Sequence, residues 1–359
     1  MTDPAALRTG ALNLLVGCGK AMPGERVLIV HEPAGEEFYG TVIVERVVEA
    51  AGALGLRVQQ VEIAFEPEAT EVQPDLHAQM AAADLTVFLA RLGDQLRFKS
   101  MPDGTRAVIC YALNAWSLAS PFGMAPYAAF LALKSCIDDA SLAARHFRIT
   151  CPAGTDVEGT VSPSPTSLED VSISRFPMSV VRPIPAAGFS GRVALCGFLT
   201  GTGSMYYEPF SCFFEGPVAA LVREGRLTGF EGSDADVARA NAHYDFVAGR
   251  YGVDRDFVHS WHAGLHPGCS HPGPASDNMM KWSGSAFGNP RLLHFHTCGA
   301  YAPGEISWNV LDATVELDGV AVWDKGRLHP DRVPGGAEVL AAYPDVAELF
   351  AAPLREVGV

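Results

Sequence analysis

The sequence lacks a long apolar run and the pattern of a secretory leader. No stretch of about 18 uninterrupted apolar residues occurs in the chain, which argues against a transmembrane helix. Residues 1–25 carry an early Asp3 and a helical period instead of a basic start followed by an apolar block, so we expect no signal peptide. These two absences predict a cytoplasmic protein that does not contact a membrane.

The sequence also lacks paired cysteines. Its 8 cysteines form no Cys-x-x-Cys motif, so paired-cysteine metal and redox motifs are excluded. Most of them stand among apolar residues, as Cys110 and Cys196 do. In a chain of 359 residues without a secretory leader, this pattern predicts free thiols in a reducing compartment.

Positive charge is scarce. The chain has 26 Lys and Arg against 41 Asp and Glu, a formal net charge of −15, which would repel phosphate backbones and argues against a nucleic-acid partner. Apolar residues make up 48% and charged residues 19%, an ordinary globular balance that excludes wholesale disorder. The length of 359 residues predicts about two domains.

The first half of the chain, residues 1–147, alternates helical and strand patterns, which predicts a parallel sheet covered by helices. The expected strands are 26–31, 58–63, 85–90 and 107–111, and the expected helices are 4–20, 38–51, 73–83, 124–134 and 137–146. No Gly-x-Gly-x-x-Gly motif follows the first strand, where His31 to Glu36 stand instead, so a dinucleotide site is not supported.

The second half, residues 148–359, is rich in Gly, Pro, Ser and β-branched residues, which favours strands and turns. The expected strand segments are 192–199, 211–223, 291–298 and 305–317, with one clear helix from Asp234 to Gly249. The predicted fold class is therefore α/β: an N-terminal Rossmann-like parallel-sheet domain (1–147) followed by a mainly β C-terminal domain (148–359).

Histidines cluster in the second half. Six of the 11 fall between 259 and 296, at His259, His262, His266, His271, His294 and His296. In the strand-like run 292–298, period-two alternation places His294 and His296 on one face and Phe295 on the other. Imidazole is a common ligand of borderline metals, so a third ligand from the 262–266 segment would complete a site with open positions.

Two other interpretations of these histidines stay open: acid–base and substrate-binding groups without a metal, or structural histidines bonded to backbone. Carboxylates near the cluster are few, which argues against calcium or magnesium. Cys269 and Cys298 lie beside the histidines, so a Cys–His nucleophile pair is conceivable, although a small apolar filler is the commoner role. The chain has no Gly-x-Ser-x-Gly elbow for Ser–His–Asp catalysis.

Several segments along the chain resemble the thermophilic-type metallo-aminopeptidases, and more closely their 2,5-dihydroxypyridine 5,6-dioxygenase-like relatives. The matching segments are Cys151 to Asp156, Phe176 to Val180, His262 to Pro267, and Gly299 through Val310 to Gly319. The chain length fits the oxygenase branch better than the longer peptidases. The resemblance implies an enzyme, a metal cofactor and a homo-oligomer.

Most metal ligands that the resemblance implies are substituted here. A metal-binding Glu of the peptidases corresponds to Ser179, and a second corresponds to His262, which looks like an iron ligand of the oxygenase branch. The His-x-Asp pair of both branches corresponds to Ser307 and Asn309, which are poor replacements as iron or zinc ligands. Either the metal has moved to His262 with His294, His296 or His266, or it has been lost and the pocket reused.

The predicted site follows from these residues. We expect His262, His296, Ser307 and Asn309 to be catalytic, His266, Tyr301 and Glu305 to contact substrate, and His262, His294 and His296 to hold a metal. Fe(II) is the leading metal, with Zn or Mn as alternatives and a metal-free form also open. The predicted function is an enzyme acting on a small polar cyclic or heteroaromatic molecule, and the family resemblance implies ring-cleaving dioxygenase chemistry. The alternatives are an amide or lactam hydrolase, metal-dependent or metal-free, and a non-catalytic small-molecule binder.

Overall fold

The computed structural model describes residues 2–36, 38–69, 71–97, 99–161, 171–202, 206–300 and 302–359. Contacts divide the chain into two compact units. Unit 1 comprises Met1–Leu131 and Glu169–Ser179, and unit 2 comprises Ala132–Leu168 and Val180–Val359. Each unit is therefore built from two separate pieces of the chain, and the division after residue 147 stays a prediction.

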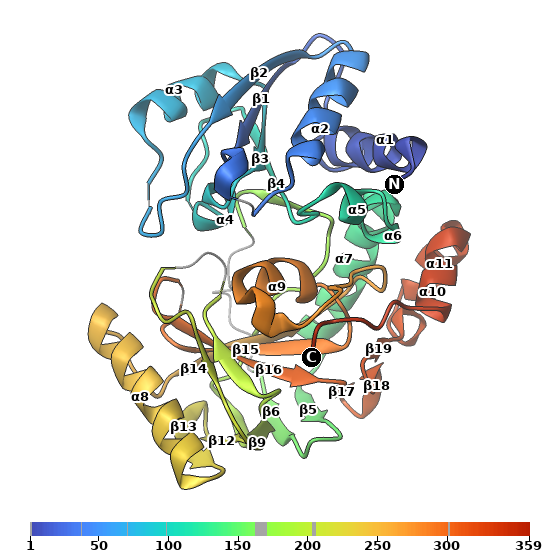
Figure 1. Cartoon of the computed structure of the whole chain (residues 1–359). Helices are drawn as coiled ribbons and strands as arrows, with labels where there is room; N and C mark the ends of the chain where they lie inside the picture. Colours follow the sequence, from blue (N-terminus) through green and yellow to red (C-terminus); the bar gives the residue numbers. More distant parts are fainter. Residues whose placement is uncertain are drawn as a thin grey trace. The chain divides into compact units, whose positions relative to one another are not determined.

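Within the described residues, unit 1 holds a parallel sheet of five strands in the order β2-β1-β3-β4-β7 (Figure 1). The strands are β1 (Arg26–His31), β2 (Arg57–Glu62), β3 (Leu85–Leu89), β4 (Arg106–Cys110) and β7 (Ser174–Phe176). The helices are α1 (Pro4–Leu12), η1 (Asn13–Cys18), η2 (Ala34–Glu36), α2 (Thr41–Ala53), α3 (Pro74–Ala82), α4 (Leu92–Gln95), α5 (Ala115–Leu118) and α6 (Pro121–Met124). Strands separated by helices produce the parallel pairing of β1 to β4, as the sequence predicted, whereas β7 was not predicted.

Helix α7 (Tyr127–Ala143) crosses from unit 1 into unit 2. The sequence predicted two helices here, 124–134 and 137–146, and that prediction is wrong. The chain between them, Lys134 to Cys136, contains no Gly or Pro, so nothing in its backbone ends the first helix.

Unit 2 contains two antiparallel sheets among its described residues, one of eight strands and one of six. The larger has the order β13-β12-β9-β6-β5-β17-β18-β19 and the smaller β11-β10-β16-β15-β14-β8. The strands are β5 (His146–Thr150), β6 (Asp156–Thr160), β8 (Ile184–Pro185), β9 (Phe189–Ala194), β10 (Phe198–Thr200), β11 (Ser211–Phe213), β12 (Ala219–Arg223), β13 (Arg226–Glu231), β14 (Val258–Ala263), β15 (Leu292–Cys298), β16 (Glu305–Leu311), β17 (Thr314–Leu317), β18 (Val320–Asp324) and β19 (Arg327–Leu328).

Unit 2 has more helices than the single one predicted. Besides α8 (Asp234–Tyr251), it has η3 (Ala275–Asp277), α9 (Met279–Ala286), η4 (Pro330–Arg332), α10 (Gly336–Ala342) and α11 (Pro344–Ala351). These helices are short, so their apolar period covers too few turns to stand out in the sequence. The predicted α/β class, with a parallel N-terminal sheet and antiparallel C-terminal sheets, is confirmed.

Aromatic side chains join the two sheets of unit 2. Trp261 of β14 meets Phe147 of β5 with ring centroids 5.8 Å apart, and Phe189 of β9 at 6.2 Å. Phe295 of β15 packs on Trp308 of β16 at 5.7 Å. These buried rings lie on one face of the six-stranded sheet, which leaves its other face for the residues that alternate with them.

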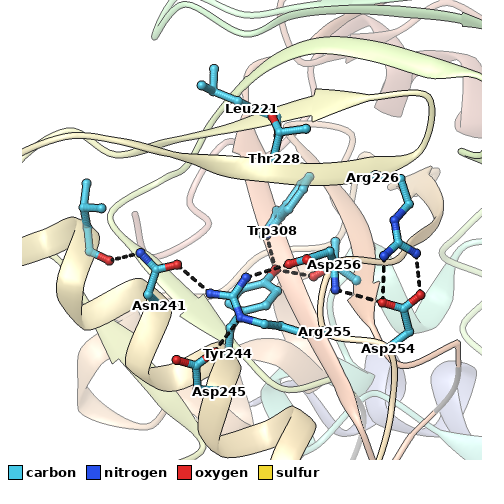
Figure 2. A network of polar contacts seen from close by, with 12 residues as sticks. Leu221, Arg226, Thr228, Asn241, Tyr244, Asp245, Asp254, Arg255, Asp256 and Trp308 are labelled. Carbon is cyan, nitrogen blue, oxygen red and sulfur yellow. Dashed lines mark hydrogen bonds and ion pairs between the residues drawn. The ribbon is translucent and has the colours of Figure 1, made fainter.

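Helix α8 packs on the same aromatic face through a polar network (Figure 2). Trp308 donates its Nε1 hydrogen to the Tyr244 hydroxyl at 2.5 Å, and the Tyr244 ring lies 5.5 Å below the Arg255 guanidinium. Arg255 in turn bonds Asn241 at 2.5 Å and Asp245 at 2.6 Å. The network therefore attaches the aromatic face of β16 to helix α8.

Candidate metal centre

Strand alternation separates the aromatic side chains from the histidines in the six-stranded sheet. On β15, Phe295 faces the aromatic side, so His294 and His296 face the other side, as the sequence predicted. The register pairs His262 of β14 with His294 and places Ser260 opposite His296. Three histidines from two adjacent strands therefore share one face.

The three imidazoles converge. Nε2 of His262 lies 2.6 Å from Nε2 of His294 and 3.1 Å from Nε2 of His296. The candidate ligand atoms of all three residues lie within 4.8 Å of one another. His262 and His294 are buried, whereas the His296 side chain is 13% exposed, so the cluster is open at His296.

Each imidazole has its own support. Nδ1 of His262 lies 3.0 Å from the Val181 carbonyl, and Nδ1 of His296 lies 2.6 Å from Oε1 of Glu305. The Phe287 ring, just after α9, stacks on His294 with centroids 4.2 Å apart and planes 19° apart. A carbonyl oxygen only accepts hydrogen bonds, so Nδ1 of His262 carries the proton, while Nδ1 of His296 lies beside the Glu305 carboxylate.

These contacts decide what the cluster can bind. With Nδ1 protonated, a neutral His262 has a lone pair on Nε2. Nε2 of His262 and Nε2 of His296 lie 3.1 Å apart, at hydrogen-bond distance, and a shared cation would replace that contact. Metal-ligating histidines characteristically donate the other ring nitrogen to a carboxylate or carbonyl, as His262 does here, and Nδ1 of His296 lies beside the Glu305 carboxylate. The donor set therefore fits a metal ion, with His262, His294 and His296 as the candidate ligands.

Ser307 and Asn309 lie beside this cluster on β16. The register places Asn309 opposite His294 and Ser307 opposite His296. Both side chains are fully buried, and the Ser307 hydroxyl donates to Oδ1 of Asn309 at 3.3 Å. Asn309 Nδ2 has no hydrogen-bond partner among the described residues, and neither has Oγ1 of Thr200, the cross-strand neighbour of Ser307 on β10. A row of polar groups therefore continues from the histidines across the sheet.

Glu305 is held close to His296. Besides its contact with His296, it accepts a hydrogen bond from the Thr202 hydroxyl, and its main-chain oxygen accepts one from the Tyr207 hydroxyl at 2.8 Å. This arrangement makes Glu305 a positioning group for His296, and the predicted contact with substrate stays a prediction. No sequence pattern marks Thr202 as functional, because a hydroxyl in a Gly-rich segment has many roles.

His266 is not part of the converging group. Its Nδ1 accepts a hydrogen bond from the Gly268 amide at 3.1 Å, and complete burial lowers its pKa to about 3. His266 is therefore a neutral core histidine at ordinary pH, and its predicted substrate contact is untested. Tyr301, the other predicted substrate contact, lies outside the described residues.

The cysteines beside the cluster are buried thiols. Burial raises the pKa of Cys298 to about 12 and that of Cys269 further above its usual range. Cys269 donates to the Ser285 carbonyl at 2.9 Å. Because the thiolate is the nucleophilic form, neither residue is activated for Cys–His chemistry. All 8 cysteines are free thiols, as the sequence predicted.

Known structures share this fold. The chain is similar to 2,5-dihydroxypyridine dioxygenase from Pseudomonas putida KT2440, at 16% identity and a TM-score of 0.61 over 92% of this chain and 98% of that one. It is also similar to wild-type AmpT from Thermus thermophilus, at 13% identity and a TM-score of 0.51 over 90% of this chain and 99% of that one. No protein-family model matches the chain, and no curated protein matches it.

These likenesses extend over nearly the whole chain. The predicted fold-level resemblance to the dioxygenase and its aminopeptidase-type relatives is therefore confirmed. At these identities the likeness establishes the fold, which is one that enzymes use, and the reaction must be argued from the site. Among the described residues, no helix is both long and apolar enough to cross a bilayer.

Proposed function

We propose that this protein is a metal-dependent enzyme whose ion is held by His262, His294 and His296. The convergence of their three Nε2 atoms carries the proposal. The proposed substrate is a small polar cyclic or heteroaromatic molecule, and the leading reaction is Fe(II)-dependent ring-cleaving dioxygenation. The fold shared with 2,5-dihydroxypyridine dioxygenase supports this choice.

The proposed ligand set differs from the one that the resemblance implies. That set would use the positions of Ser307 and Asn309 on β16, whereas His294 and His296 stand on β15. Because His296 pairs with Ser307 and His294 with Asn309 in the register, a shift by one strand keeps the ligands on the same face of the sheet. This register supports a relocated metal over a lost one.

The chain's own residues have distinct tasks in this proposal. When bound, Fe(II) would supply Lewis acidity and an electron source for reaction with dioxygen. Glu305 lies beside Nδ1 of His296 and would hold a proton there, which would keep Nε2 available. Phe287 covers His294 and excludes water from that side. The Asn309 amide and the Ser307 hydroxyl are placed to orient a substrate oxygen beside the cluster.

A second candidate function is metal-dependent hydrolysis of an amide or lactam. Three histidines without a carboxylate are a ligand set of catalytic zinc, which activates water near neutral pH. The Asn309 Nδ2 group, which lacks a hydrogen-bond partner among the described residues, would donate to a developing oxyanion. Metal-free hydrolysis and simple binding are the outcomes expected if no metal is found.

Metal analysis tests the proposal directly. Untagged protein is purified with and without chelation, and its metal content is measured by mass spectrometry alongside His262→Ala and His271→Ala variants. His271 is a matched control because its Nδ1 bonds the Ser285 hydroxyl at 2.7 Å, outside the cluster. We expect near-stoichiometric metal in the wild type and His271→Ala, and none in His262→Ala. Equal metal in all three would refute the site.

Oxygen uptake then separates the two reactions. The iron-loaded enzyme is expected to consume oxygen with a dihydroxypyridine or a related ring, whereas a zinc hydrolase would release product without oxygen. Turnover that persists after full chelation would instead favour histidine acid–base chemistry. We also propose that the partners are a small molecule and further copies of this chain, which light scattering can test.

A further inference from the structure

The contacts that position His262 extend beyond the Val181 carbonyl, which its Nδ1 contacts. Val181, whose carbonyl accepts from Nδ1 of His262, is joined by a peptide bond to Arg182. The Arg182 amide donates to Oδ1 of Asp138, on α7, at 2.8 Å. One peptide group therefore connects a cluster histidine to a carboxylate from another part of the chain.

The geometry of this peptide couples the two contacts. The bond between Val181 and Arg182 is trans, so its carbonyl and amide point in opposite directions within one plane. Asp138 and His262 thus lie on opposite sides of the same peptide. Pro183 follows and restricts Arg182 to an extended backbone. Fixing the amide on Asp138 therefore also fixes the direction of the carbonyl that receives the His262 proton.

Asp138 is suited to fixing this peptide because Lys134 balances the negative charge of its carboxylate. Its Oδ2 lies 2.6 Å from Nζ of Lys134, one helical turn earlier on α7, and both side chains are only 13% exposed. A hydrogen bond from an amide to a carboxylate is stronger than one between neutral groups. It also polarises the peptide and makes the carbonyl oxygen a better acceptor, by cooperativity along the chain of bonds.

We propose that Asp138 is a positioning residue for the histidine cluster. Acting through the peptide between Val181 and Arg182, it holds His262 in the Nδ1–H form with Nε2 directed at His294 and His296. Its consequence for metal affinity rests on the proposed function, whereas its effect on the His262 tautomer does not.

Two variants of Asp138 and one control test this role. Asp138→Ala removes the acceptor, and Asp138→Asn keeps an oxygen for the Arg182 amide but removes the charge. Asp236→Asn is the matched control, since Asp236 is a buried carboxylate of the same unit that accepts the Glu215 and Gly216 amides and pairs with Arg239. If Asp138→Ala does not fold, Asp138→Asn carries the test.

The first readout uses metal-free protein. Nitrogen NMR of histidine-labelled protein, assigned with His262→Ala, reports which ring nitrogen of His262 carries the proton. We expect the Nδ1–H form in the wild type and in Asp236→Asn, and a mixture of tautomers in both Asp138 variants. An unchanged His262 tautomer in a folded Asp138 variant would overturn the proposal, whether or not the protein binds metal.

The second readout is zinc affinity, measured by competition with a chromophoric chelator. Loss of a supporting contact behind a ligand costs about 10- to 100-fold in metal affinity. We expect about tenfold weaker binding in Asp138→Ala, less in Asp138→Asn, and no change in Asp236→Asn. Equal zinc affinity in wild type and His262→Ala means that the proposed function has failed, and the tautomer readout then decides on Asp138 alone. Strong wild-type binding with unchanged Asp138 variants overturns only the role of Asp138.

Discussion

Two central strands of the molecule, β3 in unit 1 and β15 in unit 2, are both buried but carry different residues. In β3 the sequence Leu-Thr-Val-Phe-Leu places mostly apolar side chains on both faces. In β15 the sequence Leu-Leu-His-Phe-His-Thr-Cys places Phe295 on one face and two imidazoles on the other. Burying an imidazole costs free energy unless its nitrogens find partners. A strand that buries His294 and largely buries His296 is therefore suited to a functional site, and a strand like β3 to stability.

The largest effect is expected from removing a cluster histidine. His262→Ala should abolish metal binding and turnover, because its Nε2 faces both other rings. The loss of folding stability in His262→Ala should be modest, since the His262 side chain lacks the large apolar surface of an apolar core residue. Metal analysis and thermal melting measure the two effects. Full turnover in this variant would contradict the placement of the site.

The opposite pattern is expected in unit 1. Phe88 of β3 is completely buried, so Phe88→Ala should lower the free energy of unfolding by about 3–5 kcal/mol. Metal bound per folded molecule should not change, because Phe88 belongs to the other unit. Urea unfolding and metal analysis check both statements. If Phe88→Ala kept its stability but lost its metal, the assignment of β3 to stability and of β15 to the site would be wrong.

An intermediate effect is expected from Glu305→Gln. The amide keeps the size of the side chain but removes the carboxylate charge 2.6 Å from Nδ1 of His296. Metal affinity should fall about 10- to 100-fold. Thr202→Val is a useful companion, because it removes the other hydrogen bond to the Glu305 side chain and should weaken metal binding less. Competition with a chelator measures both, and an equal loss in the two variants would argue that Glu305 acts only structurally.

The smallest effect concerns pH. His266 is buried with a pKa lowered to about 3, against about 6.5 in an unfolded chain. As the pH falls below about 6.5, the unfolded chain binds a proton that the folded chain excludes. The free energy of unfolding should therefore decline toward acid by at most about 1.4 kcal/mol per pH unit from this residue, and be fully retained above pH 6.5. His266→Gln should show a shallower decline in urea unfolding between pH 7 and 5, and identical slopes would exclude this contribution.

The same contrast explains what the sequence could predict. Strands β1, β3 and β4 of unit 1 are short apolar runs, so their positions follow from composition, and 26–31 was predicted at its observed bounds. Strand β7, Ser-Arg-Phe, has no such pattern and was not predicted. The alternation of β15 likewise predicted that His294 and His296 share a face. The clustering of histidines predicted a third ligand from the 262–266 segment, and the family resemblance singled out His262, which stands on another strand.

Other parts of the site depend on contacts between distant segments. The Val181 carbonyl and the Phe287 ring support the histidines, but a backbone carbonyl has no sequence signature and a Phe is ordinarily core. Asp138 stands in a helix that the sequence divided in two, more than a hundred residues before His262. Such partners are set by tertiary packing, which local patterns do not encode.

The two faces of β16 have a consequence for how such a protein can change during evolution. Trp308, on the aromatic face of β16, donates a hydrogen bond to Tyr244 of α8. Ser307 and Asn309 lie on the other face, opposite His296 and His294. Because neighbouring residues of a strand face opposite ways, substitutions at 307 and 309 leave the aromatic packing intact. In the proposed site, ligands could thus be exchanged between β15 and β16 by point mutations, without rebuilding the scaffold. One such sheet would therefore accommodate different ligand sets, and with them different metals.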